Sequence, residues 1–438
     1  MNKIYKLVWN TSINAWAVVS EVTASKTKAK KSALATAIAV VGLMAASQNA
    51  MAYEAGGGST YTNCTANSTG SGTKMDSGIA IGSDPTATTP TTNGACAPTQ
   101  QSIAIGNNAS TAKNASSTGN HGQSIAIGNQ AWASGDQSIA FGANVRTSGN
   151  SGVAIGGDDI DKAIASDGTK YTALTGDVLK AGAYTPTTAS GAASTALGMQ
   201  NVASEAFAVA IGTRSEASGI ASIAMGTRAL ATDQGAMAIG AVSTASASGA
   251  TAIGMNTDAQ GVNSTAIGSG NTAGGGAQAT GDNATAIGSG SSASADATAI
   301  GTGAKATLAG GVAIGTDSVS AIDKGVAGYD PITGLASTAT DATWNSSRAA
   351  VSVGDVANGV TRQITGVAAG TENSDAVNVA QLKTIKTYAD NIANSTADAL
   401  GGGAALDSTT GSITAPAYTL GTSTYDMLAM PYRPLAVR

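Results

Sequence analysis

The chain of 438 residues has few of the side chains that normally fill a globular core, and little charge. Only 4% of its residues are aromatic, 11% are charged, and there are just two phenylalanines, Phe141 and Phe207. Ordinary domains bury many large aromatic and branched side chains. Here the apolar fraction of 42% is mostly alanine, accompanied by 57 glycines. The composition therefore excludes a conventional compact core and predicts a thin, repetitive one.

Residues that carry chemistry are also scarce. His121 is the only histidine, and a single histidine in a loop is normally just solvated. No nucleophile elbow or phosphate-binding loop occurs in a suitable context, so we expect no enzyme, cofactor or metal centre. The acidic pair Asp158 and Asp159 offers calcium ligands, but we expect a solvated loop, because the repeats lack the regular aspartates of calcium-binding rolls.

The N-terminus has the pattern of a targeting segment. Lysines at 26, 28, 30 and 31 precede the apolar run 33–46, and the small residues Ala50 and Ala52 follow it. This is the order of a secretory signal peptide, and the run is shorter than the roughly 20 residues of a membrane-spanning helix. Cleavage after Ala52 would leave 16 basic and 26 acidic residues, a net charge of −10. That charge disfavours nucleic acid as a partner.

Both cysteines, Cys64 and Cys96, lie in the part predicted to be exported. A disulfide between them suits an oxidising compartment. Two unpaired thiols are the alternative that the sequence leaves open.

A pattern of one variable residue, alanine, a large apolar residue and glycine recurs fourteen times between residues 79 and 315. Its glycines stand fourteen residues apart at 128, 142 and 156, and again from 198 to 268. Fourteen residues are too few for a helix pair or a propeller blade, but they suit one coil of a β-solenoid with two short strands. A glycine after each triplet permits positive φ at the corner. We predict an all-β repeat head over 79–315, with an inserted loop at 157–190.

Side-chain size predicts which face of each coil is buried. The third position of the triplet is always large, so we place it in the core: Ile81, Ile105, Ile127, Phe141, Ile155, Leu197, Ile211, Met225, Ile239, Ile253, Ile267, Ile287, Ile300 and Ile314. The second position is alanine in every copy, so we expect this face to pack closely against a neighbouring chain, because one thin solenoid buries little surface per residue. We expect Trp132 to pack against protein rather than to anchor a ligand.

Beyond residue 315 the period ends. Residues 316–347 are predicted to form a connector, and 348–383 lead into a helical pattern with Asp375 near its start. Apolar and small residues then follow alternating spacings of three and four: Leu382, Ile385, Ala389, Ile392, Thr396 and Ala399. This spacing predicts the seam of a short coiled coil.

These elements resemble, in the same order, those of the YadA-like trimeric autotransporter adhesins. The coils resemble the SVAIG-type head repeats, and RQITGVAAGTENSDAVNVAQLK, at the end of 348–383, resembles the family's neck. MNKIYKLVWNTSINAWAVVSE, residues 1–21, resembles the extended signal peptide region. The resemblance implies an extended signal peptide at 1–52, an irregular segment at 53–78 and a homotrimeric head that is a left-handed parallel β-roll. It also implies the start of a trimeric coiled-coil stalk at 384–426.

The resemblance also implies a function. Family members adhere to extracellular-matrix proteins such as collagen, fibronectin or laminin, to host cells and to other bacterial cells. Many weak, similar contacts along a rigid trimeric rod would supply the avidity. The protein would be exported through the inner membrane and displayed on the outer membrane by type V secretion. The ligand-binding residues are unknown, because the repeat explains the scaffold only.

Two alternatives stay open. Residues 427–438 depart from the stalk pattern and no anchor strands follow them, which puts surface anchoring in doubt and leaves a truncated, non-functional adhesin fragment as an alternative. A structural or ice-binding solenoid is the other. For ice binding we would expect a continuous threonine ladder, and Val209, Ile223 and Met237 interrupt the series of threonines in the triplets: Thr195, Thr251, Thr265, Thr285 and Thr298.

Overall fold

A computed structural model describes residues 5–10, 15–20, 79–82, 95–97, 101–111 and 122–425. The chain divides into two compact units, residues 1–138 and 139–438. The predicted cleavage site at Ala50 and Ala52, His121 and the C-terminal residues 427–438 lie outside the described residues. Cys96 is disulfide-bonded, whereas Cys64 lies outside the described residues, so the pairing of the two cysteines stays a prediction.

The first unit contains a hairpin and the first coils. Strands β1 (Tyr5–Asn10) and β2 (Ala15–Ser20) pair antiparallel within the predicted signal region. Three triplet strands pair parallel and in register: β3 (Ile79–Ile81), β4 (Ile103–Ile105) and β5 (Ile125–Ile127). A second parallel row joins Cys96, Ser110 and Trp132, the last of these in β6 (Trp132–Ala133).

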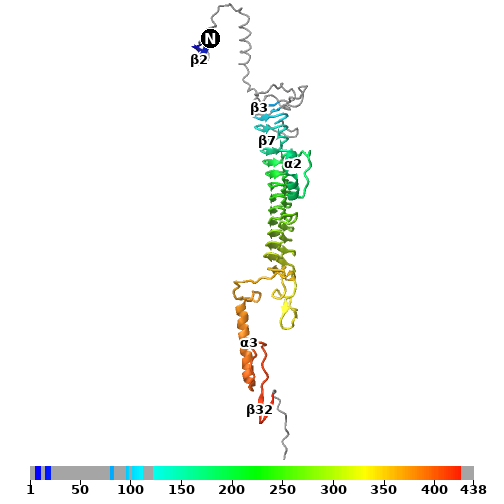
Figure 1. Cartoon of the computed structure of the whole chain (residues 1–438), viewed down its shortest axis with the longest axis vertical. Helices are drawn as coiled ribbons and strands as arrows, with labels where there is room; N and C mark the ends of the chain where they lie inside the picture. The colour runs from blue at the N-terminus through cyan, green and yellow to red at the C-terminus, as the bar shows by residue number, and fades with distance from the viewer. Residues whose placement is uncertain are drawn as a thin grey trace, which may run out of the picture. The chain divides into compact units, whose positions relative to one another are not determined.

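The second unit contains a parallel β-solenoid with two sheets, in which each coil contributes one strand to each sheet (Figure 1). Sheet I contains the triplet strands β7 (Ile139–Gly142), β9 (Val153–Gly157), β11 (Thr195–Met199), β13 (Val209–Thr213), β15 (Ile223–Met225), β17 (Met237–Ile239), β19 (Thr251–Ile253), β21 (Thr265–Ile267), β23 (Thr285–Ile287), β25 (Thr298–Ile300) and β27 (Val312–Ile314), followed by β31 (Val351–Ser352). Sheet II contains β8 (Arg146–Thr147), β10 (Thr188–Ala189), β12 (Val202–Ala203), β14 (Glu216–Ala217), β16 (Leu230–Ala231), β18 (Thr244–Ala245), β20 (Asp258–Ala259), β22 (Gln278–Ala279), β24 (Ser292–Ala293), β26 (Lys305–Ala306) and β28 (Val319–Ser320). The predicted parallel solenoid is confirmed; its left-handed sense stays a prediction.

The interior of the solenoid consists of small side chains. The middle alanine of every triplet in the second unit is completely buried, as are the alanines of most sheet II strands. Buried serines and threonines complete this interior, and several hydroxyls donate hydrogen bonds to carbonyls of their own or the adjacent coil, as Thr257 Oγ1 does to Gly268 O (2.6 Å). The largest fully buried side chains are those of Val145 and Asn201, so the two sheets approach too closely for larger side chains to fit between them.

The predicted core was on the wrong face of the strand. Among the large third-position residues, Phe141 is 50% exposed and Ile314 is 45% exposed. None of the fourteen is buried within the single chain: Ile81, Ile105, Ile127, Phe141, Ile155, Leu197, Ile211, Met225, Ile239, Ile253, Ile267, Ile287, Ile300 and Ile314. Side chains in a strand alternate between two faces, so placing the alanine inside forces its two neighbours outside. The alanine face packs against the chain's own second sheet, not against a neighbouring chain.

Two kinds of corner join the sheets. Corner 1 leads from sheet I to sheet II and begins with the repeat glycine, whose φ is +140° at Gly226. A Cβ atom there would overlap the carbonyl oxygen of Gly240 on the next coil, so only glycine fits. Corner 2 leads from sheet II back to sheet I and places the residue two before each triplet in the left-handed region, as at Asn263 with φ of +55°.

The charged insert leaves the solenoid at corner 1, between β9 and β10. It is not simply a loop, because residues Asp161–Thr175 form helix α2, which ends at Gly176 in the left-handed conformation. The helix lies alongside the strand stack (Figure 1). Asp177, just after the helix, accepts a 2.7 Å hydrogen bond from Arg214 and lies 3.7 Å from Arg228. These contacts fix the insert against two later coils.

The connector and neck continue directly from the last coil. Strand β28 extends the solenoid to residue 320, further than the predicted boundary at 315. The connector contains the hairpin of β29 (Tyr329–Asp330) and β30 (Leu335–Ala336), and β31 then rejoins sheet I beside β27. After the short 3-10 helix η1 (Val356–Asn358), the guanidinium of Arg362 donates to Ser318 Oγ (3.0 Å) and to the carbonyls of Thr316 and Val353. Arg362 thereby caps the final corner.

Helix α3 (Val379–Leu400) is the helical part of the predicted stalk. It begins with a capping box in which Asn378 accepts from the Gln381 amide and Gln381 accepts from the Asn378 amide. Asp375, which we expected near the helix start, lies four residues before Val379 and accepts hydrogen bonds from the backbone amides of Thr371 and Glu372. The predicted seam from Leu382 to Ala399 lies within this helix. The remaining described residues of the predicted stalk, 401–425, are not helical and include the hairpin of β32 (Tyr418–Leu420) and β33 (Ser423–Tyr425). A run of three glycines, 401–403, ends the helix.

Candidate functional site

The outer face of sheet I carries an apolar stripe two side chains wide. We define the apolar stripe as the first and third residues of the triplet strands in the second unit: Ile139, Phe141, Val153, Ile155, Thr195, Leu197, Val209, Ile211, Ile223, Met225, Met237, Ile239, Thr251, Ile253, Thr265, Ile267, Thr285, Ile287, Thr298, Ile300, Val312 and Ile314. All of them are half-buried or exposed. Because soluble monomers rarely expose long continuous apolar surfaces, such a stripe marks an interaction surface.

Four threonines form an in-register ladder within the apolar stripe. Thr251, Thr265, Thr285 and Thr298 pair directly across neighbouring strands. Upstream the same row contains Met237, Ile223 and Val209, and isoleucines occupy the parallel row beside the ladder. The face is therefore mixed, without the continuous threonine surface that we would expect for ice binding.

The outer face of sheet II is mostly polar, although Val202, Leu230 and Val319 also lie on it. We define the polar face as the first residue of each sheet II strand and the residue after that strand. Nine of the latter carry hydroxyls: Ser148, Ser190, Ser204, Ser218, Thr232, Ser246, Thr280, Ser294 and Thr307. Several of these hydroxyls donate to a carbonyl on the next coil, as Thr280 does to Ala293 (3.1 Å) and Ser294 to Ala306 (3.2 Å). The hydroxyl row ties the coils together and offers further acceptor sites to solvent or a ligand.

One polar-face residue carries an unfavourable charge. Asp258 is half-buried between Thr244 and Gln278 on the adjacent strands. Removal from water raises the pKa of the Asp258 carboxyl above its ordinary value of 3.8, and a hydrogen bond from Thr244 opposes this effect. The ionised carboxylate therefore destabilises the fold relative to the unfolded chain at neutral pH.

We expect the Asp258→Asn variant to be more stable than the wild type at pH 7, by up to about 1 kcal/mol. The gain should vanish as the pH falls through the raised pKa and below 3.8, because both wild-type states then bind the proton. Thermal unfolding at a series of pH values measures the difference. Glu216→Gln, at the exposed equivalent position of β14, serves as the control, and a gain that did not depend on pH would contradict the assignment.

Asp158 and Asp159, the two acidic residues at the start of the insert, make different hydrogen bonds. Asp158 is only 5% exposed and accepts a hydrogen bond from Asn144 Nδ2 (2.8 Å). Asp159 accepts the backbone amide of Asp161 (2.8 Å) at the start of α2. Within the described residues, no group of three or more histidine, cysteine, aspartate or glutamate side chains is placed to hold a metal ion. The hydrogen bonds of Asp158 and Asp159 give both residues a role in the local structure of the insert. We therefore do not propose that they bind calcium.

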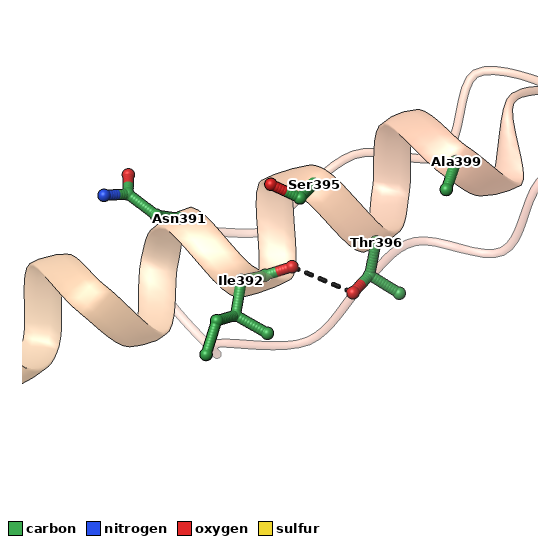
Figure 2. Close-up of a pocket in the computed structure, with 5 residues that line it drawn as sticks. All are labelled: Asn391, Ile392, Ser395, Thr396 and Ala399. Carbon is green, nitrogen blue, oxygen red and sulfur yellow. Dashed lines mark hydrogen bonds between the residues drawn. The ribbon is translucent and has the colours of Figure 1, made fainter.

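The predicted coiled-coil seam is exposed on α3. Leu382, Ile385 and Ile392 are 60%, 65% and 52% exposed. Further along, an open hollow of about 450 Å³ is lined by Asn391, Ile392, Ser395, Thr396 and Ala399 (Figure 2). The Thr396 hydroxyl donates to the Ile392 carbonyl (2.8 Å), which leaves its methyl group free to pack. Three of these residues, Ile392, Thr396 and Ala399, belong to the predicted seam.

Trp132 is half-buried on β6, between the fully buried alanines 131 and 133. It follows the alternation of the sheet II strands and is therefore not on a free polar loop. Across the part of the chain that the structure describes, no helix is both long and apolar enough to span a membrane.

Three family models match the chain in the order in which its parts occur. The extended signal peptide of the type V secretion system matches residues 1–49. The YadA head domain repeat matches seven segments between residues 122 and 318, some of which overlap. The coiled stalk of trimeric autotransporter adhesin matches residues 363–405.

Curated proteins with similar sequence are all adhesins by name. Autotransporter adhesin BadA of Bartonella henselae is 56% identical over 75 residues, which are 17% of this chain and 2% of the relative. Trimeric autotransporter adhesin AtaA of Acinetobacter sp. (strain Tol 5) is 49% identical over 73 residues, 17% of this chain and 2% of the relative. Autotransporter adhesin NhhA of Neisseria meningitidis serogroup B is 46% identical over 48 residues, 11% of this chain and 8% of the relative. The chain thus spans a small fraction of each relative's length.

Two solved structures are similar to parts of the chain. The C-terminal YadA-like domain of a Burkholderia pseudomallei protein shows 34% identity and a TM-score of 0.20, covering 27% of this chain and 56% of that chain. The collagen-binding domain of the Yersinia adhesin YadA shows 24% identity and a TM-score of 0.21, covering 60% of this chain and 83% of that chain. Because both TM-scores are far below 0.5, neither likeness bears on the function.

Proposed function

This chain belongs to the YadA-like trimeric autotransporter adhesins, and we propose that it forms the head, neck and first part of the stalk of a homotrimeric surface adhesin. The family is one of adhesins and not of enzymes. The observation that carries the proposal is the pairing of an apolar stripe with a polar face on opposite sides of one thin solenoid. One side is suited to association between chains, and the other to contact with a ligand in water.

The apolar stripe is the surface that we assign to the trimer interface. It continues along eleven strands of sheet I in the second unit, and its partly exposed isoleucine side chains form an apolar surface longer than soluble monomers normally present to water. The seam on α3 gives independent support, because a heptad seam with this exposure requires partner helices. The stalk model that matches residues 363–405 is described as that of a trimeric autotransporter adhesin, which is consistent with three copies.

The polar face is the surface that we assign to ligand contact. It would remain in water when the stripes are buried, and it repeats a hydroxyl-bearing position on nine of its eleven coils. A ligand that is itself long and repetitive would meet many similar weak contacts, multiplied by three chains and many trimers. We propose extracellular-matrix proteins of the collagen, fibronectin or laminin class, and other cells displaying the same adhesin, as its partners. The signal region supports export, and display on the outer membrane belongs to the same proposal.

Binding of the purified chain to immobilised collagen, fibronectin and laminin tests the proposal. We expect binding to at least one of them, with slow dissociation that becomes faster when the trimer is separated into single chains. Cells that display the protein should also clump, whereas cells without it should not. Absence of binding to all three proteins together with absence of clumping would contradict the proposed adhesion.

A further inference from the structure

Corner 2 holds an exposed aromatic side chain in an unfavourable backbone conformation. Phe207 is 62% exposed and has a φ of +62°. This region is uncommon for residues other than glycine, asparagine and aspartate, and it is an outlier for a bulky residue. At the equivalent position the other coils of the second unit have only small or polar residues: Ser151, Ala193, Ala221, Gly235, Gly249, Asn263, Asn283, Asp296 and Gly310. Phe207 is therefore costly for the single chain in both exposure and conformation.

A second apolar side chain lies on the next coil of the same corner. Ile220 is 47% exposed, and the turn that carries it is joined to that of Phe207 by the hydrogen bond from the Ala221 amide to the Ala206 carbonyl (2.8 Å). We call Phe207 and Ile220 the corner knob. The buried Ala208 alone separates Phe207 from Val209 of the apolar stripe, so the corner knob is continuous with the surface assigned to the trimer interface.

The number of residues in each corner indicates which of the two corners has no room for added residues. Between β7 and β28 both enlarged turns occur at corner 1: the insert between β9 and β10, and the glycine-rich turn between β21 and β22. The enlarged corner 2 of the second unit is the connector that leaves the last coil after β28 and returns to sheet I at β31. Between β7 and β28, corner 2 has five intervening residues in every coil except the one between β24 and β25, which has four. A corner facing solvent tolerates added residues, whereas a corner packed against another chain does not.

We propose that corner 2 packs against a second copy of this chain, and that the corner knob sets the axial register of the chains. The inference rests on the proposed homotrimer and adds to it the residues that define its alignment. Nearly identical coils stacked about 4.8 Å apart allow chains to slip by one coil while keeping most stripe contacts. Because Phe207 has no equivalent on the neighbouring coils, a slipped arrangement leaves its side chain in water. A single distinctive contact can specify register in a repetitive interface.

The test compares Phe207→Gly with Asn263→Gly in the full chain by sedimentation over a range of concentrations. Both substitutions place glycine at a left-handed position of corner 2, so the backbone change is the same. We expect Phe207→Gly to raise the concentration at which trimers dissociate by about tenfold or more, and Asn263→Gly to behave like the wild type. Equal behaviour of the two variants in an intact trimer would overturn the inference, whereas a monomeric wild type would overturn the proposed homotrimer itself.

A photo-crosslinking residue, p-benzoylphenylalanine, in place of Phe207 tests the contact directly. Trimers formed from chains labelled with ¹⁴N and ¹⁵N distinguish links between copies from links within one chain. We expect links between copies, to peptides within about one coil of residue 207. Links confined to the same chain, or to coils far from residue 207, would overturn the assignment.

Discussion

Replacing Gly226 by alanine is expected to destabilise the solenoid by about 3 kcal/mol or more, because the new Cβ atom would cause both backbone strain and a steric clash. A φ of +140° is accessible essentially only to glycine. The added Cβ would also overlap the backbone oxygen of Gly240, which cannot turn away as a flexible side chain would. The coil must therefore open or shift, and the hydrogen bond from the Gly240 amide to the Met225 carbonyl (2.8 Å) is lost with it.

Hydrogen exchange at the Gly240 amide measures this effect locally, which matters because repeat proteins do not always unfold as one unit. We expect exchange to accelerate by about 100-fold or more in the variant. Gly235→Ala is the matched control: Gly235 has a φ of +65°, and a methyl group added there would meet no atom within 4 Å. That variant should lose only about 1 kcal/mol. Similar losses in the two variants would show that the close approach between coils is not what requires glycine.

Replacing Ile287 by glutamate is expected to separate the trimer while leaving the single solenoid folded. Ile287 lies in the apolar stripe on β23 and is 36% exposed in one chain. Its side chain points away from the alanine interior, so a charge there meets water in the monomer. In the trimer the substitution would place three carboxylates in a buried apolar surface, which is strongly unfavourable. We expect the concentration needed for trimer formation to rise by about 100-fold or more.

Ser292→Glu provides the control, because Ser292 lies on β24 of the same coil but on the polar face. This variant should sediment like the wild type, within about twofold in its dissociation concentration. Circular dichroism of both variants verifies that the strands persist. A trimer that tolerates Ile287→Glu as well as it tolerates Ser292→Glu would contradict the assignment of the apolar stripe to the interface.

The spacing of the glycines predicted the fourteen-residue repeat well, because the backbone geometry of the corners imposes that spacing. Each glycine after a triplet is required where a coil turns so close to the next that no Cβ fits, as at Gly226, and this requirement recurs every fourteen residues. The helical seam through Ile385 and Ile392 was likewise readable from its spacing. The helix ends at Leu400, one residue after Ala399, the last position of the predicted seam, and the three glycines that follow are a strong signal for a helix terminus.

The direction in which each triplet faces could not be obtained from its alternation. The two-residue alternation indicates that Ile253 and Ala252 lie on opposite faces of the strand. It does not indicate which of the two faces points into the solenoid. Our choice of the larger residue for the core follows the usual rule for globular domains. The rule failed because a solenoid with only two short strands per coil has an interior too narrow for isoleucine, and this narrowness is a property of how the two sheets approach each other.

The sequence by itself determined the class of this protein: the fourteen-residue coil and its parallel stacking follow from local spacing and recurring residue types, and the head, neck and signal-region motifs carry the resemblance to an adhesin family. Only the tertiary structure decided which surfaces are free. It placed the alanines inside and the isoleucines outside, brought Asp177 to Arg214 and Arg228 across two coils, and set Phe207 beside Ile220. These outcomes depend on distances between residues that are remote in sequence, and such distances exist only once the coils are stacked.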